Sequence, residues 1–465
     1  MTPFLFYKVK TTNRKEEKAT MWRTSTVKKV VKFGGSSLAS AEQFKKVGEI
    51  IGSDEGRRYV VPSAPGKRFS SDIKVTDMLY KCYALAEKGE DFSKMLSQIK
   101  ERYHEIIQGL ELQMSLDYEF EVIGAQFQEK AGKEYAASRG EFLNGIIMAR
   151  YLGYEFIDAA DVILFDENGV FLGEETNERV RERLQHSERA VIPGFYGATK
   201  EGVVKTFSRG GSDVTGSIVA RAIHASMYEN WTDVSGFLVT DPRIVRNPEV
   251  IDVITYKELR ELSYMGATVL HEDAIFPVRR EGIPINIRNT NHPEDPGTMI
   301  VRTTCKKPKF IITGIAGKKG FVGVNIEKAM MNAEIGFGRK VLEAFEQYGI
   351  SFEHMPSGID TMCLIVHQDE FEANEQKVLA QIQATAKPDS IEMETDLALI
   401  AVVGRGMKES RGVAARIFAA LSHANINIKM IDQGSSELNI IIGVRNRKFE
   451  EAIRAIYDIF VTSQL

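Results

Sequence analysis

The sequence predicts an α/β protein with an open, mostly parallel sheet that has helices on both faces, followed by two smaller α+β domains. In the first 300 residues, short apolar runs alternate with amphipathic helical patterns, which is typical of parallel strands joined by helices. Further on, two stretches repeat at an offset of 76 residues, so that Gly336 matches Gly412 and Val341 matches Ile417. A chain of 465 residues has room for about three domains.

The composition excludes some partners and compartments. Lys and Arg number 60 and Asp and Glu 64, a net charge of −4, so the chain lacks the positive field that would gather nucleic acid. Cys82, Cys305 and Cys363 form no CxxC pair, which favours neither a disulfide framework nor a structural zinc site. We therefore expect a reducing, cytoplasmic location.

Nothing in the sequence predicts a membrane span or a secretion signal. No stretch reaches the ~18 to 20 apolar residues that cross a bilayer, so we expect no membrane partner. Residues 1–27 are basic and polar, and we interpret them as an N-terminal extension, with Met21 as an alternative start. A transit peptide is a second interpretation, which Glu16 and Glu17 oppose.

The first domain is predicted to begin with a buried strand. In VKKVVKFGG, β-branched and apolar residues run into a glycine pair, which predicts a strand from Lys28 to Gly35 that ends in a tight turn. A helix from about Ser40 to Gly52 follows. Because such sheets bind ligands at the carboxyl ends of their strands, we expect chemistry at these turns. Further strands are predicted at 58–61, 157, 163–165 and 191–195.

Prolines and glycines mark a candidate linker from Asn289 to Lys309. Each repeat beyond it has the pattern strand, helix, strand, turn, strand, which indicates two copies of one α+β unit; coincidental apolar periodicity is the alternative. The predicted domains are the extension at 1–27, a catalytic domain at 28–300, and the repeats at 301–390 and 391–465. As an alternative, a strand near 310–316 belongs to the second repeat.

Three clusters carry the chemistry. Lys32-Phe33-Gly34-Gly35-Ser36 puts a lysine and two glycines before a helix, where backbone N–H groups point at an anion; packing of the glycines is the alternative. Ser208 to Asp213 brings an Arg suited to carboxylate or phosphate to a loop-to-helix junction, although a structural turn is the alternative. Trp231 to Gly236, followed by Thr240 to Arg243, suits a nucleotide, but a capped turn explains Asp-Pro equally well.

Missing motifs argue against other enzyme classes. The sequence has no GxxxxGK[ST], no HRD or DFG signature and no GxGxxG after a strand, which opposes P-loop enzymes, protein kinases and nicotinamide enzymes. His271 lies in a helical pattern, and none of the eight histidines has metal-ligand spacing. We therefore predict no metal site built from side chains.

The motifs KFGGSS, SRGE, SRGGSD, WTDVSG and TDPR occur in this order, and with them the chain from Lys28 onward resembles the aspartate kinases of the amino-acid kinase superfamily. The C-terminal repeat looks like their paired ACT domains. The resemblance implies the amino-acid kinase fold, and transfer of the γ-phosphate of ATP, with Mg²⁺, to the β-carboxylate of L-aspartate. The product would be 4-phospho-L-aspartate, the first step of lysine, threonine and methionine biosynthesis.

The chemistry of that reaction fits the motifs. An aspartate carboxylate, with a solution pKa near ~3.9, is already ionised at neutral pH, so no general base is needed. The barrier lies in bringing two anions together and in stabilising charge on the phosphoryl group. Lys, Arg and backbone N–H groups supply that stabilisation.

The resemblance also implies a role for each motif residue. Lys32 would stabilise charge on the phosphoryl group, and Asp213 would orient Lys32 and the turn at Gly35. Arg209 would hold the α-carboxylate of aspartate, and Glu141 its α-ammonium group. The other substrate residues would be Ser63, Thr76, Phe195 and Ser212, and the ATP-binding residues Lys32, Gly34, Gly35, Ser36, Thr232, Asp233, Asp241 and Arg243.

Three features depart from the family pattern. The loop between Ser63 and Thr76 is longer and more basic than in many relatives, which makes Thr76 the weakest substrate assignment. Leu238 stands where a nucleotide-stacking tyrosine is often found, and Thr268 where a lysine is frequent. We therefore expect the adenine side of the site to be built differently here.

ACT pairs of this family bind end-product amino acids, commonly lysine and sometimes threonine, and dimerise through their sheets. The resemblance thus implies feedback inhibition and a homodimer or homotetramer. The helix opened by Gly336 has free N–H groups that suit an effector carboxylate, and Glu353 would take its amino group. A purely structural dimerisation module is the alternative. The remaining predicted regulatory residues are Met331, Phe337, Gly338, Ser351 and Phe352.

Two other functions stay open beside the feedback-inhibited kinase. A superfamily member that acts on glutamate or a nucleotide is one, and the pair Arg209 and Glu141 together with the ACT repeat opposes it. A catalytically silent amino-acid sensor is the other, and the intact Lys32, Asp213 and Arg209 oppose it.

Overall fold

The computed structural model describes residues 27–463 except 209, 268, 269 and 271. These residues form two compact units. The first runs to Phe207 and includes Thr215–Glu229, and the second comprises Ser208–Val214 and the chain from Asn230 onward. The bounds of these two units differ from those of the four predicted domains. The predicted domain bounds therefore remain a prediction.

The first unit is built on parallel strands in the order β3-β4-β2-β1. Every residue of β1 from Val30 to Phe33 is buried, because strands of a parallel sheet are covered on both faces and therefore consist of nearly continuous apolar residues. A separate antiparallel hairpin joins β5 and β6. The bounds are β1 (Lys29–Phe33), β2 (Arg57–Pro62), β3 (Glu155–Phe156), β4 (Ala190–Val191), β5 (Tyr196–Ala198) and β6 (Val204–Thr206).

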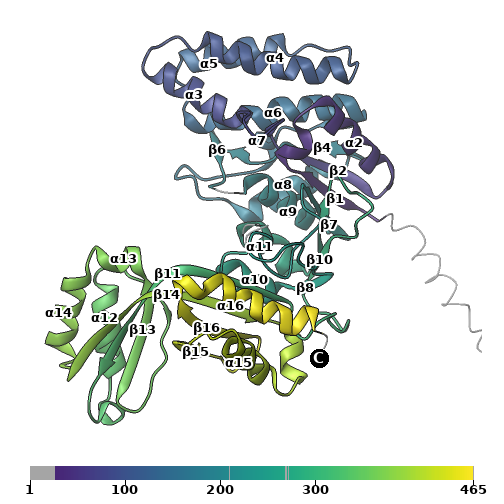
Figure 1. Cartoon of the computed structure of the whole chain (residues 1–465). Helices are drawn as coiled ribbons and strands as arrows, with labels where there is room; N and C mark the ends of the chain where they lie inside the picture. The colour runs from purple at the N-terminus through teal and green to yellow at the C-terminus, as the bar shows by residue number, and fades with distance from the viewer. Residues whose placement is uncertain (1–26, 209, 268–269, 271, 464–465) are drawn as a thin grey trace, which may run out of the picture. The chain divides into compact units, whose positions relative to one another are not determined.

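Helix α6 (Lys133–Leu152) is the central helix of this unit, since it contacts α3, β2 and β4. Helices α4 and α5 lie side by side beyond α3 (Figure 1). Gly153 ends α6 in the left-handed conformation that glycine adopts without strain. The other helices of the unit are η1 (Gly35–Leu38), α2 (Ala41–Gly52), α3 (Val75–Glu87), α4 (Ser93–Gly109), α5 (Asp117–Gln128), α7 (Ala159–Val162) and α8 (Gly173–Leu184).

Two predicted strands of this unit are wrong in part. Residues 163–165 form only isolated bridges, and β4 stops at Val191, whereas the prediction ran to residue 195. Pro193 has no N–H for a ladder, and Phe195 has a φ of 80°, so the chain cannot continue as a strand there.

Two elements, α9 (Gly211–Ala222) and β7 (Met227–Thr232), contribute residues to both units. In the second unit the strand order is β7-β9-β10-β8, with β9 and β10 antiparallel and β10 and β8 parallel. The predicted mostly parallel sheet is confirmed. The further elements here are β8 (Val253–Thr255), α10 (Tyr256–Tyr264), α11 (Glu272–Glu281), β9 (Ile285–Asn289) and β10 (Thr298–Val301).

The predicted linker from Asn289 to Lys309 is wrong in its first part, because strand β10 lies inside it, whereas residues 302–309 belong to no helix or strand. Pro293, Pro296 and Gly297 belong to the turn between β9 and β10. Gly297 has a φ of 68°, and a Cβ there would meet the Ile287 carbonyl oxygen at 1.9 Å. The glycine and prolines therefore mark a tight connection within a sheet.

The rest of the second unit is a six-stranded antiparallel sheet in the order β12-β13-β11-β14-β16-β15. The long strands β11 and β14 run side by side (Figure 1), and the first residues of β11, from Gly314, pair with β14 near Val403. The strands are β11 (Gly314–Glu327), β12 (Phe352–His354), β13 (Thr361–His367), β14 (Ser390–Val403), β15 (Met430–Asp432) and β16 (Asn439–Arg445).

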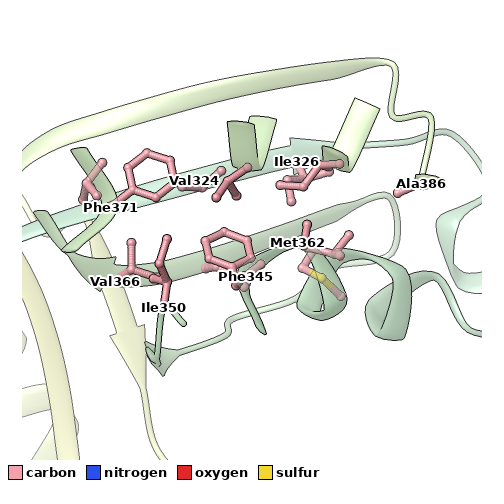
Figure 2. Close-up of a cluster of buried hydrophobic side chains, with 14 of the residues drawn as sticks. Val324, Ile326, Phe345, Ile350, Met362, Val366, Phe371 and Ala386 are labelled. Atoms are coloured by element: carbon pink, nitrogen blue, oxygen red, sulfur yellow. The ribbon is translucent and has the colours of Figure 1, made fainter. Parts of the chain in front are cut away.

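The two sequence repeats have equivalent structures. Gly336 and Gly412, both with left-handed φ, precede α12 and α15, and the matched residues Val341 and Ile417 are both fully buried. Figure 2 shows the apolar core of the first repeat, where Phe345 lies among strand side chains. The helices are η2 (Met331–Ala333), α12 (Phe337–Glu346), α13 (Gln368–Glu372), α14 (Glu375–Thr385), η3 (Arg405–Glu409), α15 (Val413–His423), η4 (Asn446–Lys448), α16 (Phe449–Tyr457) and η5 (Asp458–Thr462).

None of the helices in the described part of the chain is both long enough and apolar enough to cross a bilayer.

Candidate active site

The glycine turn after β1 lies against the loop after β2. The Gly66 N–H donates to the Gly35 carbonyl at 2.8 Å, and a Cβ on Gly35 would come within 2.8 Å of the Ala64 carbonyl oxygen. Only glycine permits this approach of two backbones. Lys32, next to last in β1, is buried, whereas Ser36 is exposed. The predicted strand, turn and helix start are therefore present, with Lys32 at the carboxyl end of its strand.

Ser63 connects this turn with helix α6. Its N–H donates to the Phe33 carbonyl at 3.1 Å, and its carbonyl accepts a hydrogen bond from the Asn144 amide at 2.6 Å. Asn144 is completely buried, and the sequence analysis did not single it out. A polar residue among the apolar residues of LNGIIM is the signal that could have identified it.

Glu141 is the most unusual side chain of the first unit. It lies on α6, is only 6% exposed, and its Oε2 has no hydrogen-bond partner among the described residues. Burial raises the pKa of its carboxyl to about 8, although a backbone hydrogen bond from Ala64 and the charges of Arg139 and Lys32 act in the opposite direction. An unsatisfied buried carboxylate oxygen suits a cationic ligand.

The remaining predicted substrate residues of the first unit lie nearer its surface. Phe195 is half-buried and has a φ of 80°, a conformation that costs a bulky residue about 1 to 3 kcal/mol. Its N–H donates to the Thr215 hydroxyl at 3.1 Å, which helps to hold that conformation. Thr76 is half-buried in the first turn of α3.

The predicted cluster at Ser208–Asp213 is described except for Arg209, which lies outside the described residues. Ser212 is buried, and Asp213 is half-buried in the first turn of α9. One carboxylate oxygen of Asp213, Oδ1, accepts a hydrogen bond from the Asn230 amide at 2.9 Å. The sequence analysis missed Asn230, although an amide inside the buried strand MYENWT is a readable signal.

The predicted nucleotide residues fall into two groups. Thr232 ends β7 and donates to the Asp233 carboxylate at 3.2 Å. Asp241 and Arg243 form an ion pair at 2.6 Å, and the hydrogen bonds from Arg243 hold the pKa of the Asp241 carboxyl below its usual range. The Arg243 backbone N–H also donates to the Asp241 carboxylate, at 2.8 Å.

Asp241 and Arg243 line a cavity of about 450 Å³. Leu238 lines it too, so an aliphatic side chain stands where the family often has a tyrosine. Thr240, which opens the predicted cluster Thr240 to Arg243, also lines it; it is 4% exposed, and its hydroxyl has no hydrogen-bond partner among the described residues. Thr268 lies outside the described residues. The cavity is therefore apolar with a few polar groups, as small-molecule sites usually are.

The predicted regulatory residues differ in how deeply they are buried. Met331 and Phe337 are buried in the core of the first repeat, so they present little surface to a ligand. Ser351 and Phe352 are exposed, and Gly338 is half-buried. The Glu353 carboxylate faces His367 at 3.5 Å, and burial together with this nearby carboxylate raises the pKa of the Tyr264 hydroxyl.

No group of three or more His, Cys, Asp or Glu side chains could hold a metal ion, as far as the described residues go. Magnesium in nucleotide sites is usually held by one or two carboxylates together with the phosphates of the nucleotide.

The comparisons with known proteins agree with the motifs. Residues 28–289 match the model of the amino acid kinase family, and residues 400–460 match an ACT domain model. Aspartokinase 3 of Bacillus subtilis is 40% identical over 454 residues, which cover 94% of this chain and 99% of the relative. The chain therefore belongs to the amino acid kinase family and, within it, to the aspartate kinases. It is a phosphotransferase with a carboxyl group as acceptor, and its C-terminal ACT region makes it an allosteric enzyme of amino-acid biosynthesis.

The chain is also similar to solved structures of aspartate kinases. The crystal structure of Clostridium acetobutylicum aspartate kinase is 54% identical, with a TM-score of 0.86 over 93% of this chain and 100% of that one. Escherichia coli aspartokinase III is 25% identical, and its complex with aspartate and ADP has a TM-score of 0.70 over 93% of this chain and 99% of that one. The same protein with lysine and aspartate, in the T-state, has a TM-score of 0.68.

Proposed function

We propose that this enzyme transfers the γ-phosphate of ATP to the β-carboxylate of L-aspartate, giving 4-phospho-L-aspartate and ADP as the first step of lysine, threonine and methionine biosynthesis. A carboxylate oxygen attacks the γ-phosphorus, and the bond between that phosphorus and the β,γ-bridging oxygen breaks. The relative from E. coli was solved with aspartate and ADP, one substrate and one product of this reaction. No proton needs to be removed from the acceptor, which is ionised at neutral pH.

The unpaired carboxylate oxygen of buried Glu141 is the observation that carries this proposal. A buried carboxylate without a partner is costly unless a ligand pairs with it. The α-ammonium group of aspartate provides that partner. When the substrate binds, Glu141 releases its proton to the solvent and forms an ion pair with that ammonium group. An acceptor that lacks an amino group cannot make this contact.

Lys32 is the proposed cation for the transferring phosphoryl group. It is buried and lies two residues before the glycine pair, whose N–H groups suit phosphate oxygens. A buried ammonium stabilises developing charge more than an exposed one, because little water screens it. Mg²⁺ is proposed to arrive on the ATP phosphates and to neutralise part of their charge.

The nucleotide is proposed to use the cavity that contains Asp241 and Arg243. Its apolar lining, which includes Leu238, suits a flat base, and Arg243 is a donor for a ribose or phosphate oxygen. The buried Thr240 hydroxyl is a further group available to such a ligand.

Regulation is proposed to work through the ACT region, with lysine as the inhibitor and threonine as the second candidate. The complex of E. coli aspartokinase III with lysine supports the choice of lysine. The enzyme is proposed to assemble as a homodimer or homotetramer through its ACT sheets.

Replacing Lys32 tests the catalytic proposal. We expect Lys32→Ala to lower the rate of acyl phosphate formation by about 100-fold or more, because a preorganised cation is lost from the transition state. Trapping the acyl phosphate with hydroxylamine measures this rate. Lys28→Ala, which removes an exposed lysine from the same segment, is the matched control and should retain activity.

A Lys32→Ala enzyme that turns over normally and keeps its circular dichroism spectrum would remove Lys32 from the mechanism. Offering glutamate in place of aspartate in the same assay tests the alternative acceptor. Adding lysine, threonine or methionine to that assay identifies the effector.

A further inference from the structure

Arg139 is a buried cation that neither the family resemblance nor the proposed mechanism uses. It is the second residue of the SRGE motif and is 7% exposed. No carboxylate of the described residues lies within ion-pair distance of its guanidinium. A buried charge usually requires an opposite charge nearby, since its desolvation is costly.

Aromatic rings hold the guanidinium in place. Its Cζ lies 4.4 Å from the ring centre of Phe142, 4.6 Å from that of Tyr135 and 5.4 Å from that of Tyr196. Phe142 and Tyr135 are three and four residues away on α6, so they flank Arg139 on one face of the helix. Such contacts stabilise a desolvated cation, and they leave its charge unneutralised.

The guanidinium is turned toward the face of α6 that carries Glu141. Its Nε and Nη2 donate to the Ser138 hydroxyl at 3.0 and 2.9 Å. Ser138 and Glu141 are three residues apart and therefore share a helix face. The charges of Arg139 and Lys32 both act to lower the pKa of the Glu141 carboxyl, against the effect of burial.

Apart from Arg139 and Lys32, the groups that act on the Glu141 carboxyl carry no positive charge. They are the tyrosines Tyr80 on α3, Tyr103 on α4 and Tyr196 on β5, together with the backbone N–H of Ala64. The Tyr103 hydroxyl donates to the Gly140 carbonyl at 2.7 Å, and that of Tyr196 donates to the Asp158 carboxylate at 2.7 Å. Burial raises the pKa of each of these tyrosines, so all three are neutral at physiological pH. Lys32 is assigned to the phosphoryl group, which leaves Arg139 as the cation reserved for Glu141.

We propose that Arg139 is a positioning residue that lowers the cost of ionising Glu141, so that the buried carboxylate can pair with the ammonium group of aspartate at neutral pH. The inference rests on the proposed function. The guanidinium itself does not touch the substrate. Its role is electrostatic, and the aromatic rings and Ser138 keep it at a fixed distance from the carboxyl.

The test is the pH dependence of KM for L-aspartate between pH 6 and 9, at saturating ATP. In the unmodified enzyme we expect KM to fall as the pH rises and to level off once Glu141 is ionised. Arg139→Gln should move this break upward by about one pH unit, which raises KM about tenfold at pH 7, with kcat changed less than threefold. Arg139→Lys keeps the charge and should restore most of the original profile.

Two further variants make the result specific. Arg150→Met removes an exposed arginine from the last turn of the same helix and should leave the profile unchanged. If Arg139→Gln does not fold, Arg139→Met replaces it, because the methionine stem keeps the packing against the three rings. Thermal unfolding of each variant confirms that the measured enzyme is folded.

A break at an unchanged pH in Arg139→Gln, or a KM raised equally at every pH, would overturn the inference. Glu141→Gln separates this failure from that of the proposed function. If Glu141→Gln abolishes the break while the Arg139 variants behave like the unmodified enzyme, only the role of Arg139 is wrong. If Glu141→Gln keeps the break and a normal KM, the proposed ammonium site is wrong as well.

Discussion

At the scale of single residues, the first unit contains one carboxyl group, that of Glu141, whose burial is unfavourable for stability but prepares it to bind a cation. Glu141 lies in α6 with a carboxylate oxygen that no described residue satisfies. A core position would be more stable with a neutral side chain. Groups whose pKa is strongly shifted by burial are concentrated at functional sites. Such groups lower the stability of the fold, and they provide a charge that is already positioned for the ligand.

The cost of Glu141 should be visible as a dependence of stability on pH. Its pKa is about 8 in the folded protein and about 4.5 in a free side chain, so the folded state holds a proton that the unfolded state releases. The stability of the unmodified enzyme therefore falls as the pH rises from about 4.5 to 8 and levels off above that. We expect Glu141→Gln to raise the free energy of unfolding by a few kcal/mol at pH 8, and by much less at pH 5.

Urea unfolding without substrates at the two pH values measures this difference. A Glu141→Gln protein that is no more stable than the unmodified one at pH 8 would show that the carboxyl is ionised without cost.

At the scale of elements, the chemistry depends on how closely two loops approach. The turn at Gly35 and the loop at Gly66 each follow one of two neighbouring parallel strands, β1 and β2. Their backbones touch, since a Cβ on Gly66 would come within 2.6 Å of the Gly35 carbonyl carbon. A motif of two glycines thus sets the shape of the turn near Lys32.

Gly35→Ala tests this contact. A Cβ would meet the Ala64 carbonyl oxygen at 2.8 Å and the Gly66 nitrogen at 3.1 Å, and both are backbone atoms that cannot move alone. We expect a loss of about 1 to 3 kcal/mol in stability and a large loss of activity. Gly52→Ala, at the end of α2 with open space around it, is the control and should be neutral or slightly stabilising. Equal effects of the two changes in thermal unfolding would contradict this account.

At the scale of the whole molecule, an ion pair between buried Glu258 and half-buried Arg405 joins the end of the sheet to the ACT region within the second unit. Glu258, in the first turn of α10, is completely buried and accepts hydrogen bonds from Thr255, Thr313 and Arg405. Its carboxylate meets the Arg405 guanidinium at 3.0 Å. Burial alone would raise the pKa of Glu258, but these hydrogen bonds lower it below its usual range.

Breaking this pair should destabilise the second unit strongly. We expect Glu258→Gln to cost about 3 kcal/mol at pH 7, because the partly buried Arg405 guanidinium loses its counter-charge. The pKa of Glu258 is lowered on folding, so this stabilisation is present at neutral pH and disappears as the pH falls through the folded-state pKa.

Thermal or urea unfolding at pH 7 measures this loss. The control is Glu346→Gln on the exposed surface of α12, whose free energy of unfolding should stay within about 0.5 kcal/mol of that of the unmodified enzyme. A Glu258→Gln enzyme as stable as the control would mean that the pair contributes nothing.

Features that depend on a few neighbouring residues could be predicted from the sequence. The strand that contains Lys32, the glycine turn after it and the helix-opening glycines Gly336 and Gly412 all follow from local periodicity and from the conformations open to glycine. The fold class and the enzyme family follow from the same local patterns, and both are confirmed.

Only the tertiary structure decided which side chains are buried and what they contact. Four of these features depend on segments that are far apart in the chain. They are the Glu141 carboxylate oxygen without a described hydrogen-bond partner, the hydrogen bonds made by the Asn144 and Asn230 amides, and the burial of Met331 in a core. The prolines and glycine near Gly297 are compatible with a linker or with a tight turn. They form a turn here because the strands on either side of them, β9 and β10, pair with each other. The physical reason is that conformation is governed by adjacent residues, whereas burial, hydrogen bonding and pKa are set by whatever the folded chain brings alongside.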